Sequence, residues 1–172
     1  RPADRDLGAA TIVPGFVEAH SPQRRSDDLD YTASVQALNQ DKQQVFERLI
    51  NEHMADDECA GFLVWGDPSL YDSTLRILQA ILDAGRCTFD YEVIPGISSV
   101  QALAARHKVP LNRIGGAVEI TTGRRLAAQQ VSTADSQVVM LDAQDAYQQV
   151  ADRELQIYWG AYLGTPDEIL IS

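Results

Sequence analysis

Cysteine, histidine and basic residues are scarce in this chain of 172 residues, and each scarcity argues against a class of protein. Two cysteines, Cys59 and Cys87, are too few for a disulfide scaffold and are typical of a reduced, cytoplasmic protein. The three histidines lie far apart without metal-ligand spacing, so we expect no metal site. Fourteen Lys and Arg against 25 Asp and Glu give a net charge of −11, which argues against a nucleic-acid partner.

Long apolar runs and several common site motifs are missing as well. No stretch approaches the roughly 20 apolar residues that cross a bilayer, so we expect no membrane partner. The sequence contains no phosphate-binding loop of the Gly-x-x-x-x-Gly-Lys-Ser/Thr type, no Gly-x-Gly-x-x-Gly and no Gly-x-Ser-x-Gly. A function therefore has to be sought in other glycine-containing turns.

Residues 61–72 are the stretch around which we interpret the rest of the chain. Residues 61–65 are mostly apolar and predict a buried strand, which breaks at the turn Gly66-Asp67-Pro68. A helical pattern follows, with Asp67 or Ser69 as its expected cap. A strand, a glycine turn and a helix form half of a βαβ unit, in which ligands bind beyond the carboxyl end of the strand.

A second strand and turn repeat this pattern. Residues 32–57 predict an amphipathic helix, and residues 89–94 predict a strand that breaks at Pro95-Gly96, before a helix capped by Ser98 or Ser99. Because such alternating elements pair in parallel, we expect both glycine turns at one edge of one sheet, where they form a crevice. The residues alone predict either a small-molecule site at this edge or plain tight turns.

The predicted fold class is α/β, with two domains. Residues 1–31 are expected to be irregular apart from a short strand at 11–13, residues 32–114 to form a parallel α/β domain, and residues 117–172 a strand-richer α/β domain. The second domain has strand candidates at 118–122, 137–141, 155–163 and 168–172, and a helix candidate at 143–150. The chain begins without Met and stops after an apolar run, so we expect both ends to be cut.

Two motifs carry a resemblance to a known family. The string Trp65-Gly66-Asp67-Pro68-Ser69-Leu70-Tyr71, followed by Val93-Ile94-Pro95-Gly96-Ile97-Ser98-Ser99, is similar to the paired signature of the tetrapyrrole (corrin/porphyrin) methylases. Four fuller strings resemble one branch of this family, the deacetylating methylases of aerobic cobalamin synthesis: Trp65–Leu78, Leu111–Gly115, Ile120–Arg125 and Tyr158–Glu168. The resemblance covers residues 40–172 well and residues 1–39 poorly.

This resemblance implies a fold, a cofactor and a reaction. Family members have two α/β domains with S-adenosylmethionine in the cleft between them, and they are commonly homodimers. The implied reaction is methylation of precorrin-5, a tetrapyrrole, at ring carbon C-1, with release of acetate. The family opens with a strand and a Gly-Asp-Pro loop of its own, which this sequence lacks together with a C-terminal continuation, so activity is not expected from this segment alone.

The resemblance also implies the cofactor-binding residues. Asp67 would place a carboxylate near the cationic methionine end, and Ser98 and Ser99 match a hydroxyl pair there, although all three equally fit helix caps. Leu141, Ala161, Tyr162 and Gly164 would lie at the adenine, although residues of these types also fit the core of a strand and a turn. The full implied set is Trp65, Gly66, Asp67, Leu70, Ser98, Ser99, Leu141, Ala161, Tyr162 and Gly164.

Catalytic and substrate-binding residues are expected from position and chemistry. Methyl transfer depends mainly on proximity and alignment. Deacetylation needs activation of a water molecule or a proton carrier, for which Tyr71 and Asp72 are the candidates. Precorrin-5 carries several carboxylates that arginine can bind in a bidentate manner. The candidate arginines are Arg76, Arg113, Arg124 and Arg125.

Two other interpretations remain open. The chain can be a methylase of the same fold that acts on another precorrin position, on RNA or on a protein. It can also be a non-catalytic module that binds S-adenosylmethionine or a nucleotide. Binding of S-adenosylmethionine and S-adenosylhomocysteine separates a methylase from a nucleotide sensor.

Overall fold

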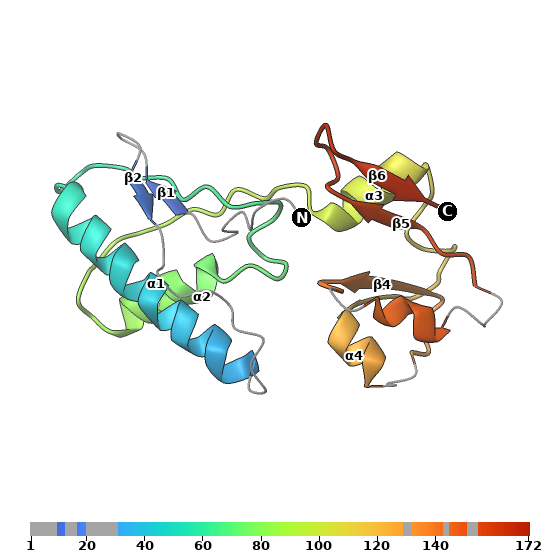
Figure 1. The fold of residues 1–172 in the computed structure, drawn as a ribbon. Coiled ribbons are helices and arrows are strands. Elements are labelled where there is room, and N and C mark those ends of the chain that lie inside the picture. Colours follow the sequence, from blue (N-terminus) through green and yellow to red (C-terminus); the bar gives the residue numbers. More distant parts are fainter. Residues whose placement is uncertain (1–9, 13–16, 20–30, 129–131, 143–144, 151–154) are drawn as a thin grey trace. The chain divides into compact units, whose positions relative to one another are not determined.

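The computed structural model describes residues 10–12, 17–19, 31–128, 132–142, 145–150 and 155–172 (Figure 1). It divides into two compact units, residues 1–96 and residues 97–172. The helix that follows Ser98 is therefore part of the second unit.

The first unit contains a small hairpin and two long helices. Strand β1 (Ala10–Ile12) pairs antiparallel with β2 (Val17–Ala19), and helices α1 (Tyr31–His53) and α2 (Thr74–Asp83) follow. The short strand expected at 11–13 corresponds to β1 as far as Ile12, since residue 13 lies outside the described residues. The sequence did not predict β2, whereas α1 agrees with the predicted helix except that it ends earlier.

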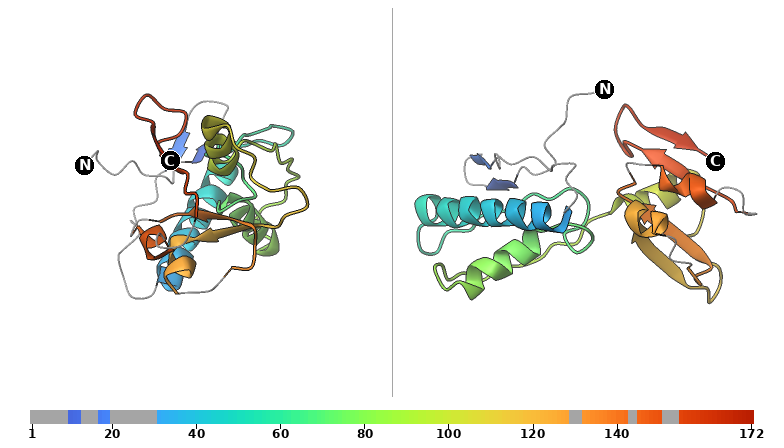
Figure 2. Two further views of the ribbon diagram at one scale, coloured as in Figure 1. Left: turned by 90° about the vertical axis from the view of Figure 1, so that its right-hand side faces the viewer. Right: turned by 60° about the horizontal axis from the view of Figure 1, so that its bottom comes forward.

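The core of the first unit lies between α1 and α2, which run side by side (Figures 1 and 2). Ile77, Leu78 and Ile81 form one apolar stripe on α2, because positions three and four apart share a helix face and Ile81 is four residues from Ile77 and three from Leu78. This stripe packs against Phe46 and Leu49 of α1. The two helices therefore form a platform on which the loops of this unit rest.

The two strands predicted for this unit, residues 61–65 and 89–94, are not formed, so the parallel sheet predicted here is wrong for the described residues. Phe62 and Phe89 pack against the core, and the Phe46 and Phe62 ring centroids are 4.6 Å apart. Neighbouring Leu63 and Trp65 are 59% and 83% exposed. Each apolar run thus attaches its loop to the two helices through some of its side chains, while others remain exposed to solvent. An apolar run favours burial but does not specify the hydrogen-bonding partner that a strand requires.

The second unit combines a parallel pair and an antiparallel pair of strands. Helix α3 (Ser99–His107) comes first, then β3 (Val118–Thr122), α4 (Gly123–Ala127), β4 (Ser136–Met140), the 3-10 helix η1 (Ala146–Val150), β5 (Trp159–Ala161) and β6 (Ile169–Ile171). Strands β3 and β4 are parallel, with Thr122 opposite Met140. Strands β5 and β6 are antiparallel, with Ala161 opposite Ile169.

Most elements predicted for the second unit are present but shorter. The strand at 118–122 is confirmed as β3, and β4 begins and ends one residue before the predicted strand. Only residues 159–161 and 169–171 of the other two candidates are paired. The helix expected at 143–150 is the 3-10 helix η1, and residues 143–144 lie outside the described residues.

The α1–α2 core leads to a stability prediction. Ile81 is completely buried, so Ile81→Ala leaves a cavity and should lower the free energy of unfolding by about 2–5 kcal/mol. Ile114→Ala removes the same atoms from a fully exposed side chain and should have little effect. Urea unfolding followed by circular dichroism measures both, and equal effects of the two substitutions would contradict this description of the core.

Candidate functional site

The turns at Gly66 and Gly96 meet in the first unit, as the sequence predicts. Gly66 has a φ of 83°, a left-handed conformation that glycine adopts without strain. A Cβ atom built on Gly96 would lie 2.1 Å from the Gly66 carbonyl oxygen, so no side chain fits there. Two stretches of main chain, far apart in the sequence, therefore approach as closely as backbone allows.

Asp67 connects these two turns. Its Oδ2 accepts a hydrogen bond from the Gly96 backbone N–H at 2.8 Å, and its Oδ1 accepts one from the Ser69 backbone N–H at 2.9 Å. The Ser69 hydroxyl also donates to Oδ1. These bonds to the charged form, first that from the Ser69 hydroxyl and then that from the Gly96 N–H, lower the pKa of the Asp67 carboxyl below its ordinary value.

The helix cap expected at Asp67 or Ser69 is wrong. Helix α2 begins only at Thr74, and the Thr74 backbone N–H donates to Asp72 Oδ1 at 2.7 Å. Asp67 instead joins two loops, because its carboxylate reaches across the sequence to Gly96. Asp67 thus does not cap α2, and its structural role is to join the two loops.

The other predicted residues of the first unit lie on the loop that leads to α2. Trp65 is largely exposed, and Tyr71 is 43% exposed with a φ of 54°, which is uncommon for a bulky residue. Asp72 holds the start of α2, as described above, so one of its oxygens already has a partner. Leu70 closes the Asp67 turn through a backbone bond of 3.3 Å to the Asp67 carbonyl.

Ser98 and Ser99 lie at the start of α3, where the sequence predicts a cap. Ser98 is the N-cap, and its Oγ accepts from the Val100 backbone N–H at 3.2 Å. Gln101 completes a capping box by accepting from the Ser98 N–H at 3.1 Å. Ser98 is buried, whereas Ser99 is exposed, so Ser99 is the member of the pair with room to meet a ligand.

Leu141 follows directly after β4, at the carboxyl edge of the parallel β3–β4 pair. It has a φ of 54° and is 55% exposed. Next to it, Asp142 accepts from the backbone N–H groups of Ala146 at 2.9 Å and Tyr147 at 3.2 Å. A Cβ on Gly123 would lie 2.4 Å from Asp142 Oδ1, so Asp142 packs directly on main chain. This edge is where parallel sheets present ligand sites.

Ala161, Tyr162 and Gly164 lie where β5 ends and the turn toward β6 begins. Ala161 belongs to β5, while Tyr162 and Gly164 have φ values of 53° and 75°. Two bonds from Thr165 reach the Tyr162 carbonyl, one from its backbone N–H at 3.1 Å and one from its hydroxyl at 2.8 Å. This tight turn leaves the Tyr162 side chain 56% exposed.

The predicted arginines lie on several separate elements. Arg76 is on α2 and lines a groove of about 240 Å³ with four amide side chains of α1: Gln36, Asn39, Gln40 and Gln43. In the second unit, Arg113 is in a loop, and Arg124 and Arg125 are on α4. All four are exposed.

Several polar residues of these sites were not predicted from the sequence. Arg106 and Glu168 form an ion pair beside the Tyr162–Gly164 turn, and Asp142 organises the loop after β4. Asp142 directly follows the strand predicted at 137–141, and an acid in this position is a signal by which it could have been found. The Arg106–Glu168 contact joins residues 62 positions apart and has no local signal.

Among the described residues, no group of three or more His, Cys, Asp and Glu side chains is close enough to hold a metal. No helix in the described ranges has the length and apolarity to cross a membrane.

The chain belongs to a methylase family. The family model of the tetrapyrrole (corrin/porphyrin) methylases matches residues 3–172, and the α/β fold agrees with this membership. A curated relative, the precorrin-6A synthase [deacetylating] of Sinorhizobium sp, is 48% identical over 156 residues, which are 91% of this chain and 60% of that protein.

A solved structure is similar as well. The crystal structure of a cobalamin synthesis related protein (CobF) from Corynebacterium diphtheriae matches with a TM-score of 0.72 and 43% identity, and the match covers 81% of this chain and 59% of that one. The chain therefore spans about three-fifths of the length of these two relatives. The resemblance inferred from the motifs is confirmed at the level of the family.

The close approach at Gly96 leads to a second prediction. Gly96→Ala pushes the Gly66 carbonyl away and should destabilise the unit by roughly 1–3 kcal/mol, as overpacking does. Gly61→Ala is the matched control, because its Cβ meets nothing within 4 Å and its φ is not positive. Thermal unfolding compares the two, and a Gly96→Ala variant as stable as Gly61→Ala would show that the turns do not meet.

A third prediction concerns pH. Because the folded-state pKa of Asp67 is lowered, its contribution to stability is present above the unfolded-state pKa of about 4 and is lost as the pH falls through the folded value. The carboxyl carbon signal of Asp67 in an NMR titration should therefore shift at a lower pH than that of a free aspartate. Asp67→Asn should remove this part of the pH dependence of unfolding, whereas an ordinary titration midpoint for Asp67 would contradict the bonds described.

Proposed function

We propose that the protein of which this chain is a part is an S-adenosylmethionine-dependent methyltransferase of cobalamin biosynthesis. Its proposed substrate is precorrin-5, which is methylated at C-1 with release of acetate to give precorrin-6A. Membership of a methylase family and 48% identity to a precorrin-6A synthase support this proposal. The observation that carries it is the meeting of the Gly66-Asp67 turn with the Gly96 main chain.

The described residues suit the proposed cofactor. S-adenosylmethionine carries a cationic sulfonium and amine at one end and a flat adenine at the other. In the first unit, the Asp67 carboxylate is negatively charged, and among the described residues its Oδ2 accepts one hydrogen bond, from the Gly96 N–H, which leaves a second lone pair for a ligand. In the second unit, the turn at Tyr162 and Gly164 presents main chain and an exposed aromatic ring that suit an adenine.

The residues of this chain contribute mainly binding and alignment. When bound, the cofactor supplies the electrophilic methyl group, and the ring carbon of the substrate supplies the electron pair. The chemistry then requires that both are held in line, which rigid main-chain turns achieve better than flexible side chains. Release of the acetyl group as acetate consumes one water molecule, which supplies the second carboxylate oxygen, and Tyr71 and Asp72 are the proposed proton carriers for this hydrolysis. The proposed partners of the precorrin carboxylates are the exposed Arg76, Arg113, Arg124 and Arg125.

Incubating the full-length protein with precorrin-5 and S-adenosylmethionine tests this function. The expected products are a methylated tetrapyrrole, acetate and S-adenosylhomocysteine, in equal amounts by mass spectrometry and enzymatic acetate assay. Methylation of another precorrin without acetate would support a different methylase of the same fold. Binding of the cofactor without turnover of any tetrapyrrole would instead support the sensor alternative.

Asp67 gives a fourth prediction on the same protein. Asp67→Ala removes the link to Gly96 and a negative charge, and should weaken S-adenosylhomocysteine binding by about tenfold, since hydrogen bonds to a charged group are stronger than neutral ones. Asp83→Ala, on the surface of α2, should bind as wild type does. Isothermal titration calorimetry measures both, and an unchanged affinity for Asp67→Ala would remove Asp67 from the proposed site.

A further inference from the structure

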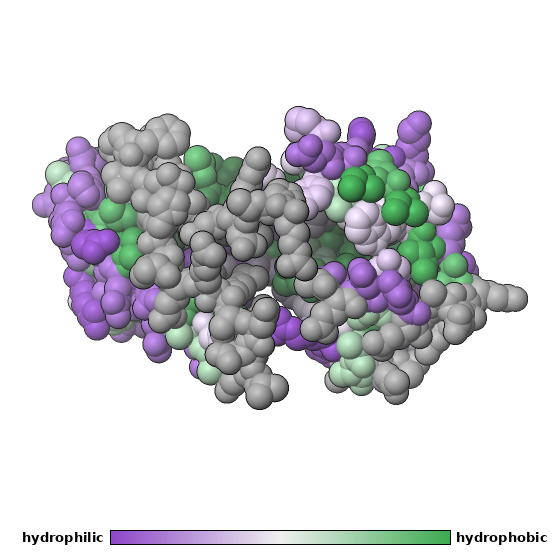
Figure 3. All heavy atoms as spheres, viewed as in Figure 1, coloured by the Kyte–Doolittle hydropathy of each residue, from purple (hydrophilic) through white to green (hydrophobic). Residues whose placement is uncertain are grey.

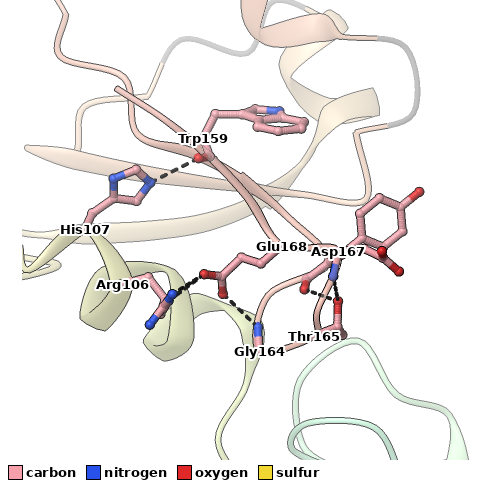
Figure 4. A network of polar contacts seen from close by, with 8 residues as sticks. Arg106, His107, Trp159, Gly164, Thr165, Asp167 and Glu168 are labelled. Carbon is pink, nitrogen blue, oxygen red and sulfur yellow. Dashed lines mark hydrogen bonds and ion pairs between the residues drawn. The ribbon is translucent and has the colours of Figure 1, made fainter.

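Three contacts join α3 to the β5–β6 hairpin within the second unit. The helix packs closely on β5, because a Cβ on Gly160 would lie 2.6 Å from Leu103 Cδ1. At the end of α3, His107 Nε2 lies 3.0 Å from the Trp159 carbonyl oxygen, and Arg106 pairs with Glu168 (Figure 4). The last of these contacts reaches beyond the strands to the turn that connects them.

Glu168 holds two partners with its two oxygens. Its Oε1 accepts from Arg106 Nε at 2.7 Å and also contacts Arg106 Nη2, while its Oε2 accepts from the Gly164 backbone N–H at 2.8 Å. The Glu168 side chain is only 11% exposed, compared with 58% for Arg106. The bond from the Gly164 N–H, and after it the bond from Arg106, lower the pKa of the Glu168 carboxyl, which stays charged near neutral pH.

The turn held in this way contains a strained residue. Tyr162 has a positive φ, a conformation that costs a bulky residue energy and persists only where the surroundings enforce it. The Thr165 bonds hold the Tyr162 carbonyl, but the N–H of Gly164 is held by Glu168. Arg106 in turn holds Glu168 against α3, the helix whose first residues are Ser98 and Ser99.

We propose that Glu168 and Arg106 are positioning residues for the adenosine part of the cofactor, because they fix the Tyr162–Gly164 turn onto α3. This inference rests on the proposed function, in which that turn contacts the adenine and the start of α3 contacts the methionine end. Neither side chain needs to touch the cofactor. Their effect passes through the position of the Gly164 main chain.

The test uses Glu168→Gln in the full-length protein. The amide keeps the size of the side chain and one acceptor for the Gly164 N–H, but it loses the charge that binds Arg106. We expect the dissociation constant of S-adenosylhomocysteine, and the KM for S-adenosylmethionine, to rise about fivefold, with kcat and the KM for precorrin-5 unchanged. Asp83→Asn is the matched control, since Asp83 accepts an exposed bond of 2.8 Å from Gln79 on α2.

A double-variant cycle shows whether the two residues act as a unit. Arg106→Gln alone should weaken binding about as much as Glu168→Gln, and the double variant should be no weaker than either. Hydrogen exchange of the Gly164 amide should become faster in each variant, while global thermal unfolding stays within a few degrees of wild type. If Glu168 and Arg106 had a merely structural role, their substitution would lower the amount of folded protein, and so the apparent kcat, without raising the KM for S-adenosylmethionine.

The outcomes separate this inference from the function on which it rests. If wild type fails to bind S-adenosylhomocysteine, the proposed function is overturned and this inference with it. If wild type binds and Glu168→Gln binds equally well, this inference alone is overturned. Fully additive effects of the two substitutions would also overturn it, because independent residues do not form one positioning unit.

Discussion

The hydrogen bond between the Gly96 N–H and the Asp67 carboxylate is the contact on which the candidate site of the first unit depends. Neither loop has a β-ladder among the described residues to hold it in place. Phe62 and Phe89 attach the loops to the α1–α2 platform, but this attachment does not determine how the two glycine turns face each other. The Asp67 carboxylate determines how the two turns face each other. Because Gly66 and Gly96 have no side chains, this close approach is sterically allowed.

The second unit uses the same device at another turn. There a carboxylate, Glu168, accepts from a glycine N–H at a turn with left-handed backbone, and a salt bridge holds the carboxylate itself. In both places the residues with positive φ are predicted site residues: Gly66 and Tyr71 in one unit, Tyr162 and Gly164 in the other. Unusual backbone of this kind persists only where neighbouring contacts enforce it, and it is concentrated at functional sites.

Local chemistry could be predicted well from the sequence. The apolar stripe of α2, the Ser98 cap of α3 and strand β3 all follow from patterns within a few residues. The meeting of Gly66 and Gly96 was also predicted, although from a parallel sheet that the described residues do not form.

Features that depend on distant partners could not be predicted. The stretch 61–65 is apolar enough for a strand, but pairing depends on where other backbone groups lie. Helix α2 begins at Thr74, and Asp67 accepts from Gly96, 29 residues away, instead of capping this helix. A positive φ at Tyr162 and the pairing of Arg106 with Glu168 arise in the same way, from tertiary contacts that override local preference.

A crystal structure of the full-length protein with S-adenosylhomocysteine tests the central claim most directly. The account predicts that the thioether end lies against the Gly66-Asp67 main chain and that Asp67 still accepts from the Gly96 N–H. A nucleoside bound elsewhere, or a bound state in which Asp67 and Gly96 have separated, would contradict it.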